Sequence, residues 1–352
     1  MSIIKLPGLI DPHVHLRDPG QTHKEDFFTG TAAAIAGGFT TVIDMPNNVD
    51  PIFTQERLSE KRLEASSKTV CDIGFHFGSL GDNLDEFSKV KNNVFGLKLY
   101  LNFTTGGFII DGPALTRIYD AWNTATGGRK PILLHAEEDV MELVVTAIKK
   151  TGQPTHICHV SSEEELSAII KAKHDGLPIT CGVCPHHMFL TEDDVKSIGA
   201  FALMKPSLKT KKDVEFLWKN LHYIDIFESD HAPHTYEEKK SDAPPFGVPG
   251  LETTLPLMMN AVHEKRLTIE ELISKCYEQP KEIFHLSEQE NTHIEVDPIE
   301  YEIRNELLFT KCKWSPFNGW KVRGRVVKTV IRGKTVYEHG VMKATRGWGE
   351  VL

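Results

Sequence analysis

The sequence predicts an α/β fold: a TIM or (β/α)8 barrel with a small β module formed mainly by the C-terminal segment. Two observations carry this prediction. Between residues 8 and 229, short segments rich in Val, Ile, Leu and Phe alternate with amphipathic helical patterns, as expected for strands buried on both faces of a parallel sheet. The segment after the first strand, HVHLRDPG, also lacks the Gly-rich phosphate-binding turn that usually marks a doubly wound open sheet.

The expected strands follow one another at intervals that suit the β/α units of a barrel. They span residues 8–15, 40–46, 72–78, 95–101, 131–136, 155–160, 178–185 and 223–229. Helical patterns between and after them cover residues 24–36, 114–125, 139–150, 163–174, 212–221, 255–264 and 269–277. Residues 321–343 then read as short β segments. We therefore expect a barrel domain over residues 8–290 and a β-rich accessory module, packed on the barrel, from residues 1–7 and 291–352.

The composition excludes several classes of protein. With 40 basic and 49 acidic residues, the chain of 352 residues has a net charge of −9, which argues against a nucleic-acid-binding face. It contains no run of 18 apolar residues, and its first residues lack the pattern of a signal peptide. Six cysteines without an export signal indicate a reducing compartment. We expect a cytoplasmic protein that acts on a small molecule, binds neither nucleic acid nor membrane, and forms a homodimer, the commonest soluble assembly.

Potential metal ligands follow several of the expected strands. The active site of a TIM barrel lies at the C-terminal ends of its strands, and those ends carry His13, His15, His135, His159 and Asp230. His13 and His15 have the spacing that places two side chains on one side of a strand. Each residue alone has a simpler explanation, such as a polar rim or, for Asp230, a helix N-cap. Together they favour a metal centre, and imidazole with carboxylate suits zinc.

Lys98 lies inside the apolar strand GLKLYL, where a charged amine is costly unless it is paired. One interpretation is a rim residue whose amine reaches solvent along its aliphatic stem. The other is an amine that loses its proton and reacts with carbon dioxide, giving a carbamate that bridges two metal ions.

Other cysteines and histidines are weaker candidates. Cys181 and Cys184 have CxxC spacing without a second pair, which does not favour a zinc knuckle. Cys158 precedes His159, so we expect it to point to the opposite face as a buried thiol. His186 and His187 follow the seventh strand and are expected to support the ligands rather than to bind metal.

Eight motifs resemble those of one family. HVHLRDPG, DMPN, GLKLYL, LLHAE, ICHVS, CPHH, SDHAPH and FGVPGLET occur in this order between residues 13 and 254. They resemble the dihydroorotases of the amidohydrolase superfamily, above all the dihydroorotase domains of the animal multifunctional pyrimidine-biosynthesis enzymes. The resemblance implies reversible cyclisation of N-carbamoyl-L-aspartate to L-dihydroorotate plus water, in a pathway shared with other pyrimidine enzymes.

The resemblance also implies a ligand set and a catalytic residue. Two zinc ions are bridged by carbamylated Lys98 and a hydroxide. His13, His15 and Asp230 complete the first zinc site, and His135 and His159 complete the second. Asp230 is implied to act as the general acid and base.

Substrate contacts are implied as well. The substrate carboxylate is bound by Arg17, Asn47 and His234, and a further contact comes from the backbone around Phe246 and Gly247. A lid loop after the fourth strand offers Thr104 and Thr105, and two glycines follow them, as a mobile loop requires. Lys205 stands where relatives have Arg or Asn. Gly182 replaces a Glu of the animal-type domains, so no ligand for an additional metal is implied there.

Two other functions remain open from the sequence. Allantoinases and hydantoinases share the metal set, but allantoinases tend to carry Asn at the position of Arg17, in keeping with a substrate without a carboxylate. Arg17 therefore favours dihydroorotase, unless it forms only a rim salt bridge to Asp18 or Asp44. A catalytically silent scaffold relative would have lost metal ligands, whereas all six positions are intact here.

Overall fold

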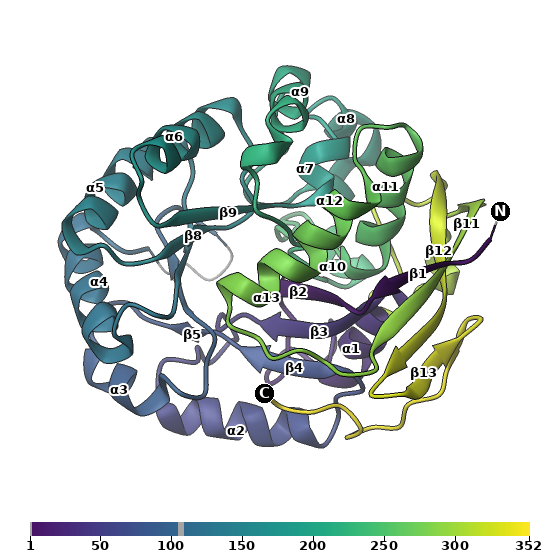
Figure 1. The fold of residues 1–352 in the computed structure, drawn as a ribbon, viewed down its shortest axis with the longest axis horizontal. Coiled ribbons are helices and arrows are strands. Elements are labelled where there is room, and N and C mark those ends of the chain that lie inside the picture. The colour runs from purple at the N-terminus through teal and green to yellow at the C-terminus, as the bar shows by residue number, and fades with distance from the viewer. Residues whose placement is uncertain (1, 105–108) are drawn as a thin grey trace.

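The parallel strands of the chain close into a ring. The computed structural model describes residues 2–104 and 109–352. Within them, the barrel consists of β2 (Leu9–Val14), β3 (Phe39–Asp44), β4 (Asp72–Phe75) with β5 (Phe77–Gly78), β6 (Leu97–Tyr100), β7 (Ile132–His135), β8 (Thr155–Ile157), β9 (Ile179–Val183) and β10 (Ile226–Phe227). Neighbouring strands pair in parallel in this order, and a bridge between Val14 and His231 joins the last strand to the first. The predicted TIM barrel is confirmed (Figure 1).

Helices surround the ring of strands (Figure 1). The longer ones are α1 (Phe27–Ala36), α2 (Gln55–Ser66), α4 (Gly112–Thr126), α5 (Met141–Thr151), α6 (Glu163–His174) and α9 (Lys211–Lys219); α3 (Phe87–Val90), α7 (Pro185–Phe189), α8 (Asp194–Ile198) and α10 (Tyr236–Lys239) are short. Side chains of Asp26, Ser162 and Thr210 cap the first turns of α1, α6 and α9 in reciprocal capping boxes, which satisfy otherwise unpaired backbone N–H groups. After the barrel come α11 (Leu251–His263), α12 (Ile269–Ile273), a π-helical turn over Ser274–Glu278, and α13 (Gln279–Ile283).

The barrel interior is apolar at one end. Ile10, Ile43, Leu133 and Ile226, from four of the strands, form one buried cluster that also includes Phe284, just after α13. The other strand positions pack against the helices in a separate, larger cluster, as the alternation of side chains along a strand requires. Polar side chains are thereby left for the C-terminal ends of the strands.

A separate antiparallel sheet lies beside the barrel and contains both the N-terminal strand and the C-terminal segment (Figure 1). Its order is β1 (Ile4–Pro7), β11 (His293–Glu302), β12 (Lys321–Ile331), β13 (Lys334–Glu338) and β14 (Val341–Met342). The β segments expected over 321–343 therefore form. Strand β11 was not predicted as a separate element, because register shifts between Glu295 and Val296 and between Asp297 and Glu300 interrupt its alternation.

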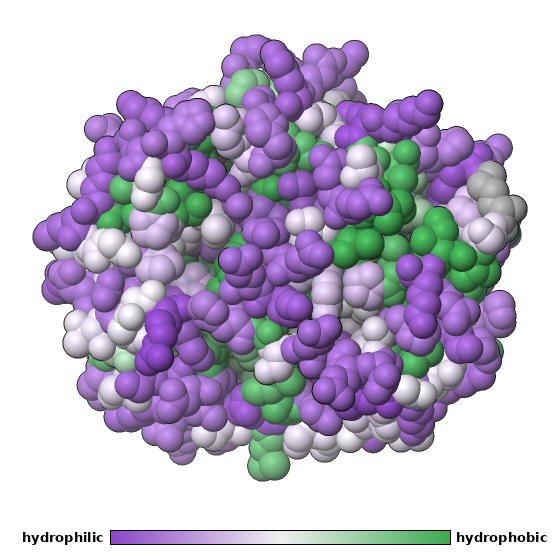
Figure 2. Space-filling view, viewed as in Figure 1, coloured by the Kyte–Doolittle hydropathy of each residue, from purple (hydrophilic) through white to green (hydrophobic). Residues whose placement is uncertain are grey.

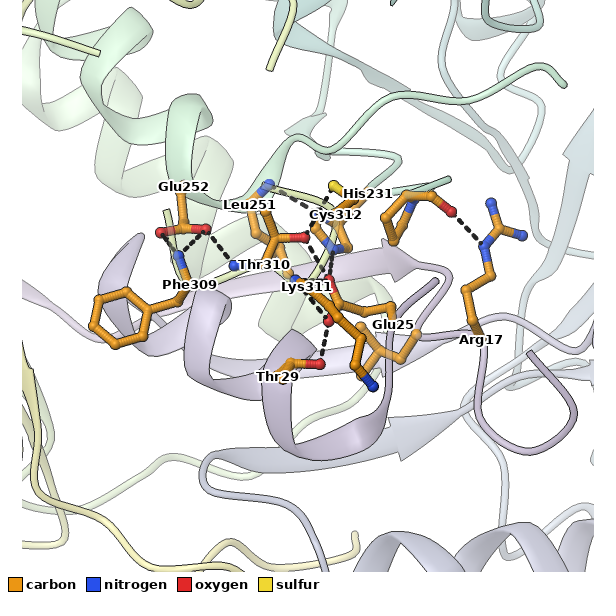
Figure 3. A network of polar contacts seen from close by, with 12 residues as sticks. Arg17, Glu25, Thr29, His231, Leu251, Glu252, Phe309, Thr310, Lys311 and Cys312 are labelled. Atoms are coloured by element: carbon orange, nitrogen blue, oxygen red, sulfur yellow. Dashed lines mark hydrogen bonds and ion pairs between the residues drawn. The ribbon is translucent and has the colours of Figure 1, made fainter. Parts of the chain in front are cut away.

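Two carboxylates, those of buried Glu25 and partly buried Glu252, bind the loop after β11 to the barrel (Figure 3). Glu252 of α11 accepts hydrogen bonds from the backbone N–H groups of Phe309 at 2.8 Å and Thr310 at 2.9 Å. Glu25 accepts from the N–H of Lys311 at 3.2 Å and from the hydroxyl of Thr310. Its carboxylate also lies 3.4 Å from Nε2 of His231. The contacts thus connect the C-terminal segment to the chain that follows β10.

The face seen in Figure 1 is largely hydrophilic, with hydrophobic residues gathered where α11 meets the C-terminal sheet (Figure 2). A cleft of about 550 Å³ lies in this region, lined by residues such as Tyr301, Arg325 and Tyr337, and it contains none of the predicted metal ligands. No helix among the described residues has both the length and the apolar character needed to cross a membrane.

Candidate active site

The predicted site residues gather in one pocket at the C-terminal ends of the barrel strands. It is lined by His13, His15, Arg17, Asn47, Lys98, Tyr100, Thr104, His135, His159, Lys205, Asp230, Ala232, Phe246 and Gly247. The pocket therefore contains every described residue predicted for the site except His234. Thr105, the second predicted lid residue, lies outside the described residues.

Several of these side chains reach the pocket through turns that follow the strands. Arg17, His159 and Asp230 have positive φ angles of 64°, 40° and 44°, which only a minority of non-glycine residues adopt. The turn at His159 means that both it and Cys158 face the barrel interior, and Cys158 offers its sulfur within 4.8 Å of ligand atoms of His13 and Glu228. The expectation that Cys158 points to the opposite face is wrong, because strict alternation ends with β8.

Asp230 meets the two histidines of the first strand. Its Oδ1 lies 3.0 Å from Nε2 of His15 and 3.3 Å from Nε2 of His13. Nδ1 of His15 donates to Asn47 Oδ1 at 2.7 Å, and Nδ1 of His13 lies 3.1 Å from Glu228 Oε2. With both Nδ1 atoms engaged as donors, the lone pairs of two imidazoles and a carboxylate oxygen converge. Such a group of acceptors requires a cation at its centre, and a metal ion fits it.

The pKa values reflect this demand for positive charge. Burial and the Lys98 charge oppose protonation of His13, but Glu228, Cys158 and Asp230 outweigh them and raise its pKa to about 10. Burial alone would raise the pKa of Asp230, yet His13 and His15 hold it well below its usual range. In the metal-free chain a proton on His13 therefore balances the carboxylates, and a bound metal would take over that role.

A second group of possible ligands lies across the pocket. Nδ1 of His135 is 3.1 Å from Nε2 of His159, and the other nitrogen of His135 donates to Glu137 Oε1 at 3.1 Å. The amine of Lys98 is buried and has no hydrogen-bond partner among the described residues; it lies 5.1 Å from the centre of the Tyr100 ring. A buried amine amid imidazoles, without a hydrogen-bonding acceptor in the described part of the chain, matches the second interpretation of Lys98 better than the rim residue does.

Arg17 is 7% exposed and has only neutral hydrogen-bond partners among the described residues. Its Nε donates to the Pro233 carbonyl at 3.1 Å (Figure 3), and Nη2 lies 3.3 Å from Nε2 of His234. The alternative interpretation, a rim salt bridge from Arg17 to Asp18 or Asp44, is not seen among the described residues; Asp44 pairs with Lys61 at 2.6 Å and Asp18 with Lys68 at 2.8 Å. The guanidinium is thus a buried cation at the pocket wall without an anionic hydrogen-bond partner among the described residues.

His234 lies behind Arg17 and is not among the residues that line the pocket. Its Nε2 donates to the Phe246 carbonyl at 2.9 Å, and its Nδ1 accepts from Lys24 at 3.3 Å. In this structure His234 therefore holds the Phe246 backbone and lies beside Arg17, and both of these residues line the pocket.

The remaining pocket residues come from loops. The Thr104 hydroxyl is buried without a hydrogen-bond partner in the described part of the chain. Lys205 lies 5.4 Å from the centre of the Phe246 ring. Gly247 has a φ of 132°, and a Cβ at this position would lie 2.5 Å from the Ala232 carbonyl oxygen. Only glycine allows this close approach of two backbone segments.

Glu228 and Glu137 are site residues that the sequence reasoning missed. Glu228 stands in IDIFES at the end of the last barrel strand, and a fully buried acid in an apolar segment is the same signal that drew attention to Lys98. Glu137 follows His135 in LLHAE.

Cys184 is grouped with His186 and His187, with ligand atoms within 4.8 Å of one another. No zinc-ligand cluster among the described residues pairs Cys184 with Cys181.

Comparisons with known proteins agree with this geometry. Residues 4–289 match the model of the amidohydrolase family. The chain is 46% identical over 352 residues to the multifunctional protein CAD of Squalus acanthias, a match that covers 99% of this chain and 16% of that protein. It is 35% identical to the dihydroorotase of Pyrococcus horikoshii, with 95% of this chain and 81% of that protein covered.

A solved structure has the same fold. The L-hydantoinase of Arthrobacter aurescens superposes with a TM-score of 0.94 at 25% identity, covering 99% of this chain and 88% of that one. The chain therefore belongs to the amidohydrolase family and, within it, to the dihydroorotases. It spans only 16% of the length of its multifunctional relatives.

Proposed function

We propose that this chain is a dihydroorotase that interconverts N-carbamoyl-L-aspartate and L-dihydroorotate in pyrimidine biosynthesis. The observation that carries the proposal is the position of Arg17. A buried guanidinium without a carboxylate partner in the described residues lines the same pocket as the candidate metal ligands. Dihydroorotate has a carboxylate next to its cyclic amide. One molecule can therefore pair its carboxylate with the guanidinium and place its amide at the candidate metal site. Allantoin and simple hydantoins lack that carboxylate and leave the cation unpaired.

We assign two zinc ions to the ligand groups described above. His13, His15 and Asp230 would hold the first and His135 and His159 the second, with Lys98 between them. As a carbamate formed with carbon dioxide, with loss of one proton, Lys98 would offer carboxylate-like oxygens to the metal ions. Bound zinc ions provide a nucleophile at neutral pH and polarise the scissile carbonyl.

The protein's own groups then orient the substrate and move the proton. Arg17 grips the carboxylate through parallel hydrogen bonds, which fixes the ring over the ligands. Asp230, ionised at neutral pH because its pKa is depressed, accepts the proton of the attacking nucleophile and delivers it to the leaving nitrogen. Asn47 contributes by holding His15 through its Oδ1, and the unpaired Thr104 hydroxyl is available to the bound substrate.

The proposal also covers the organisation of the chain beyond the pocket. The division into a barrel over 8–290 and an accessory module from 1–7 and 291–352 follows the separate antiparallel sheet. Assembly as a homodimer, and association with other pyrimidine-pathway enzymes, are suggested by general frequency and by the multifunctional relatives.

The proposal is tested by the ultraviolet absorbance of dihydroorotate. Purified, zinc-supplied protein should consume dihydroorotate and, from the other side, form it from N-carbamoyl-L-aspartate. The same preparation after treatment with a chelator should do neither until zinc is restored. Protein that holds two equivalents of zinc but leaves dihydroorotate untouched would disprove the assignment and support a silent scaffold.

A further inference from the structure

A carboxylate that the proposed ligand set does not use lies directly beside it. Glu228 follows β10 and is fully buried, with a side chain 0% exposed. Its Oε2 lies 3.1 Å from Nδ1 of His13, and its Oε1 accepts a hydrogen bond from the backbone N–H of His159. One carboxylate thereby contacts a candidate ligand of each metal, one through its ring and the other through its backbone.

The neighbouring strand leaves room for this carboxylate. Gly182 lies on β9 beside the start of β10, where it pairs with Ile226. A Cβ added to Gly182 would lie 2.6 Å from both Cδ and Oε1 of Glu228, a separation that no real contact shows. Any other residue at position 182 would therefore displace the Glu228 side chain, so the glycine and the acid form a matched pair.

We propose that Glu228 is a positioning residue for the metal centre. By accepting the Nδ1 hydrogen of His13 it selects the tautomer whose Nε2 lone pair faces Asp230. By accepting the N–H of His159 it stabilises the turn, with a φ of 40°, that directs this ring into the pocket. The inference rests on the metal centre of the proposed function. Carboxylates that orient a ligating histidine in this way raise metal affinity about 10- to 100-fold.

Two other roles are compatible with a buried acid at this place. Glu228 could serve the fold alone, or it could itself bind an extra metal together with His13 and Cys158, whose ligand atoms lie within 4.8 Å. The geometry favours positioning, because both carboxylate oxygens already accept hydrogen bonds from N–H groups. Measurements of zinc affinity, zinc stoichiometry and the His13 tautomer distinguish positioning, a purely structural role and binding of an extra metal.

The test compares Glu228→Gln, Glu228→Ala and the double variant Gly182→Asp/Glu228→Ala. An Asp at 182 places its carboxyl carbon one bond beyond a Cβ that lies 2.6 Å from the carboxyl carbon of Glu228, so it returns the carboxylate from the neighbouring strand. Zinc affinity is measured by competition with a chelator, and the tautomer of His13 by nitrogen NMR of the zinc-loaded protein, in which this ring is neutral. Asp225→Asn is the matched control, because Asp225 accepts from Cys181 N at 2.7 Å and pairs with Lys173 without lining the pocket.

We expect zinc affinity to fall about 10- to 100-fold in Glu228→Gln and Glu228→Ala, with loss of the single His13 tautomer. The double variant should recover most of both, and Asp225→Asn should change neither. Should Glu228→Ala fail to fold, the isosteric Gln variant and the relocated carboxylate still decide the question.

Wild-type affinity and an unchanged His13 tautomer in folded Glu228→Gln would overturn the proposal. So would a third equivalent of zinc that is present in the wild type and absent from that variant, because Glu228 would then be a ligand. Neither readout depends on turnover. A protein that binds two zinc ions through the predicted ligands but is inactive on dihydroorotate would refute the proposed function and leave the role of Glu228 intact.

Discussion

Oδ1 of Asp230 lies 3.0 Å from Nε2 of His15, although 215 positions separate the two residues in the sequence. The bridge between Val14 and His231 explains the contact, because it brings the chain after the last barrel strand alongside the first strand. The His15 N–H also donates to the His231 carbonyl at 2.8 Å. The ligand group is thus completed only when the barrel closes, which couples metal binding to the folded state.

Asp230→Asn should retain an oxygen for the metal but lose the proton-accepting carboxylate. We expect a large fall in turnover in both directions, with metal content largely kept. In the wild type, hydrolysis should be favoured as the pH rises, because it converts a neutral amide into a carboxylate and releases a proton; Asp230, with its depressed pKa, is ionised across this range. Cyclisation should be favoured at lower pH, since it converts one carboxylate into a neutral amide and consumes a proton. Rates in both directions between acidic and alkaline pH check this, and a wild-type rate for Asp230→Asn would rule out the proton shuttle.

Lys98→Ala should lose at least one zinc ion and nearly all activity, because no other described amine is available at this position to form the bridging carbamate. Wild-type protein prepared without bicarbonate should bind zinc more weakly, and carbon-13 bicarbonate should give a carbamate signal in NMR spectra that the variant lacks. Lys275→Met is the control, since this buried lysine donates instead to the carbonyl of Ile224. Full zinc content in Lys98→Ala would exclude the bridge.

Glu252 should make the stability of the fold depend on pH. Burial outweighs the hydrogen bonds from Thr310 and Phe309 and raises its pKa from 4.5 to about 7. The folded state then holds a proton more tightly than the unfolded state, so this contribution is complete below pH 4.5 and is lost as the pH rises through about 7. The loss amounts to at most about 3 kcal/mol.

Glu252→Gln should remove that loss while keeping an acceptor for the loop after β11. The free energy of unfolding is measured by denaturant titration from pH 4 to 8, in steps of about one pH unit. With rising pH, it should fall less steeply in the variant than in the wild type. Other buried acids, such as Asp11 with a pKa raised to about 7 by burial, contribute equally to both proteins and cancel in the difference. Identical slopes would show that the pKa of Glu252 is the same in the folded and unfolded states, against the expected rise.

The sequence predicted the site well where strand geometry alone decides it. Residues at the C-terminal ends of parallel strands lie at the same end of the barrel. The proximity of His13, His135 and Asp230 could therefore be predicted from the positions of the strands in the sequence. Arg17 lies two residues after His15, as alternation along one strand would require, but β2 ends at Val14 and a turn with positive φ delivers its side chain. The residue that the resemblance named therefore lines the pocket, although strand alternation does not place it there.

The sequence could not predict features that depend on contacts between strands. Glu228 matters because Gly182, on another strand, leaves space for its carboxylate, and that complementarity is invisible along a single strand. Cys158 was assigned to the wrong face because the left-handed turn at His159 cannot be read from alternating polarity. His234 sits behind Arg17, since its ring bonds to Lys24 and to the Phe246 carbonyl.

The central claim is that Arg17 makes this metal centre specific for a substrate with a carboxylate. The direct measurement is kcat/KM for dihydroorotate in wild-type protein and in Arg17→Gln, with zinc content determined in both and allantoin offered to the wild type. We expect the variant to keep both zinc ions yet to lose about a hundredfold or more in kcat/KM, and the wild type to ignore allantoin. A loss below about fivefold, or a wild-type preference for allantoin, would contradict the substrate assignment and leave only the metal chemistry.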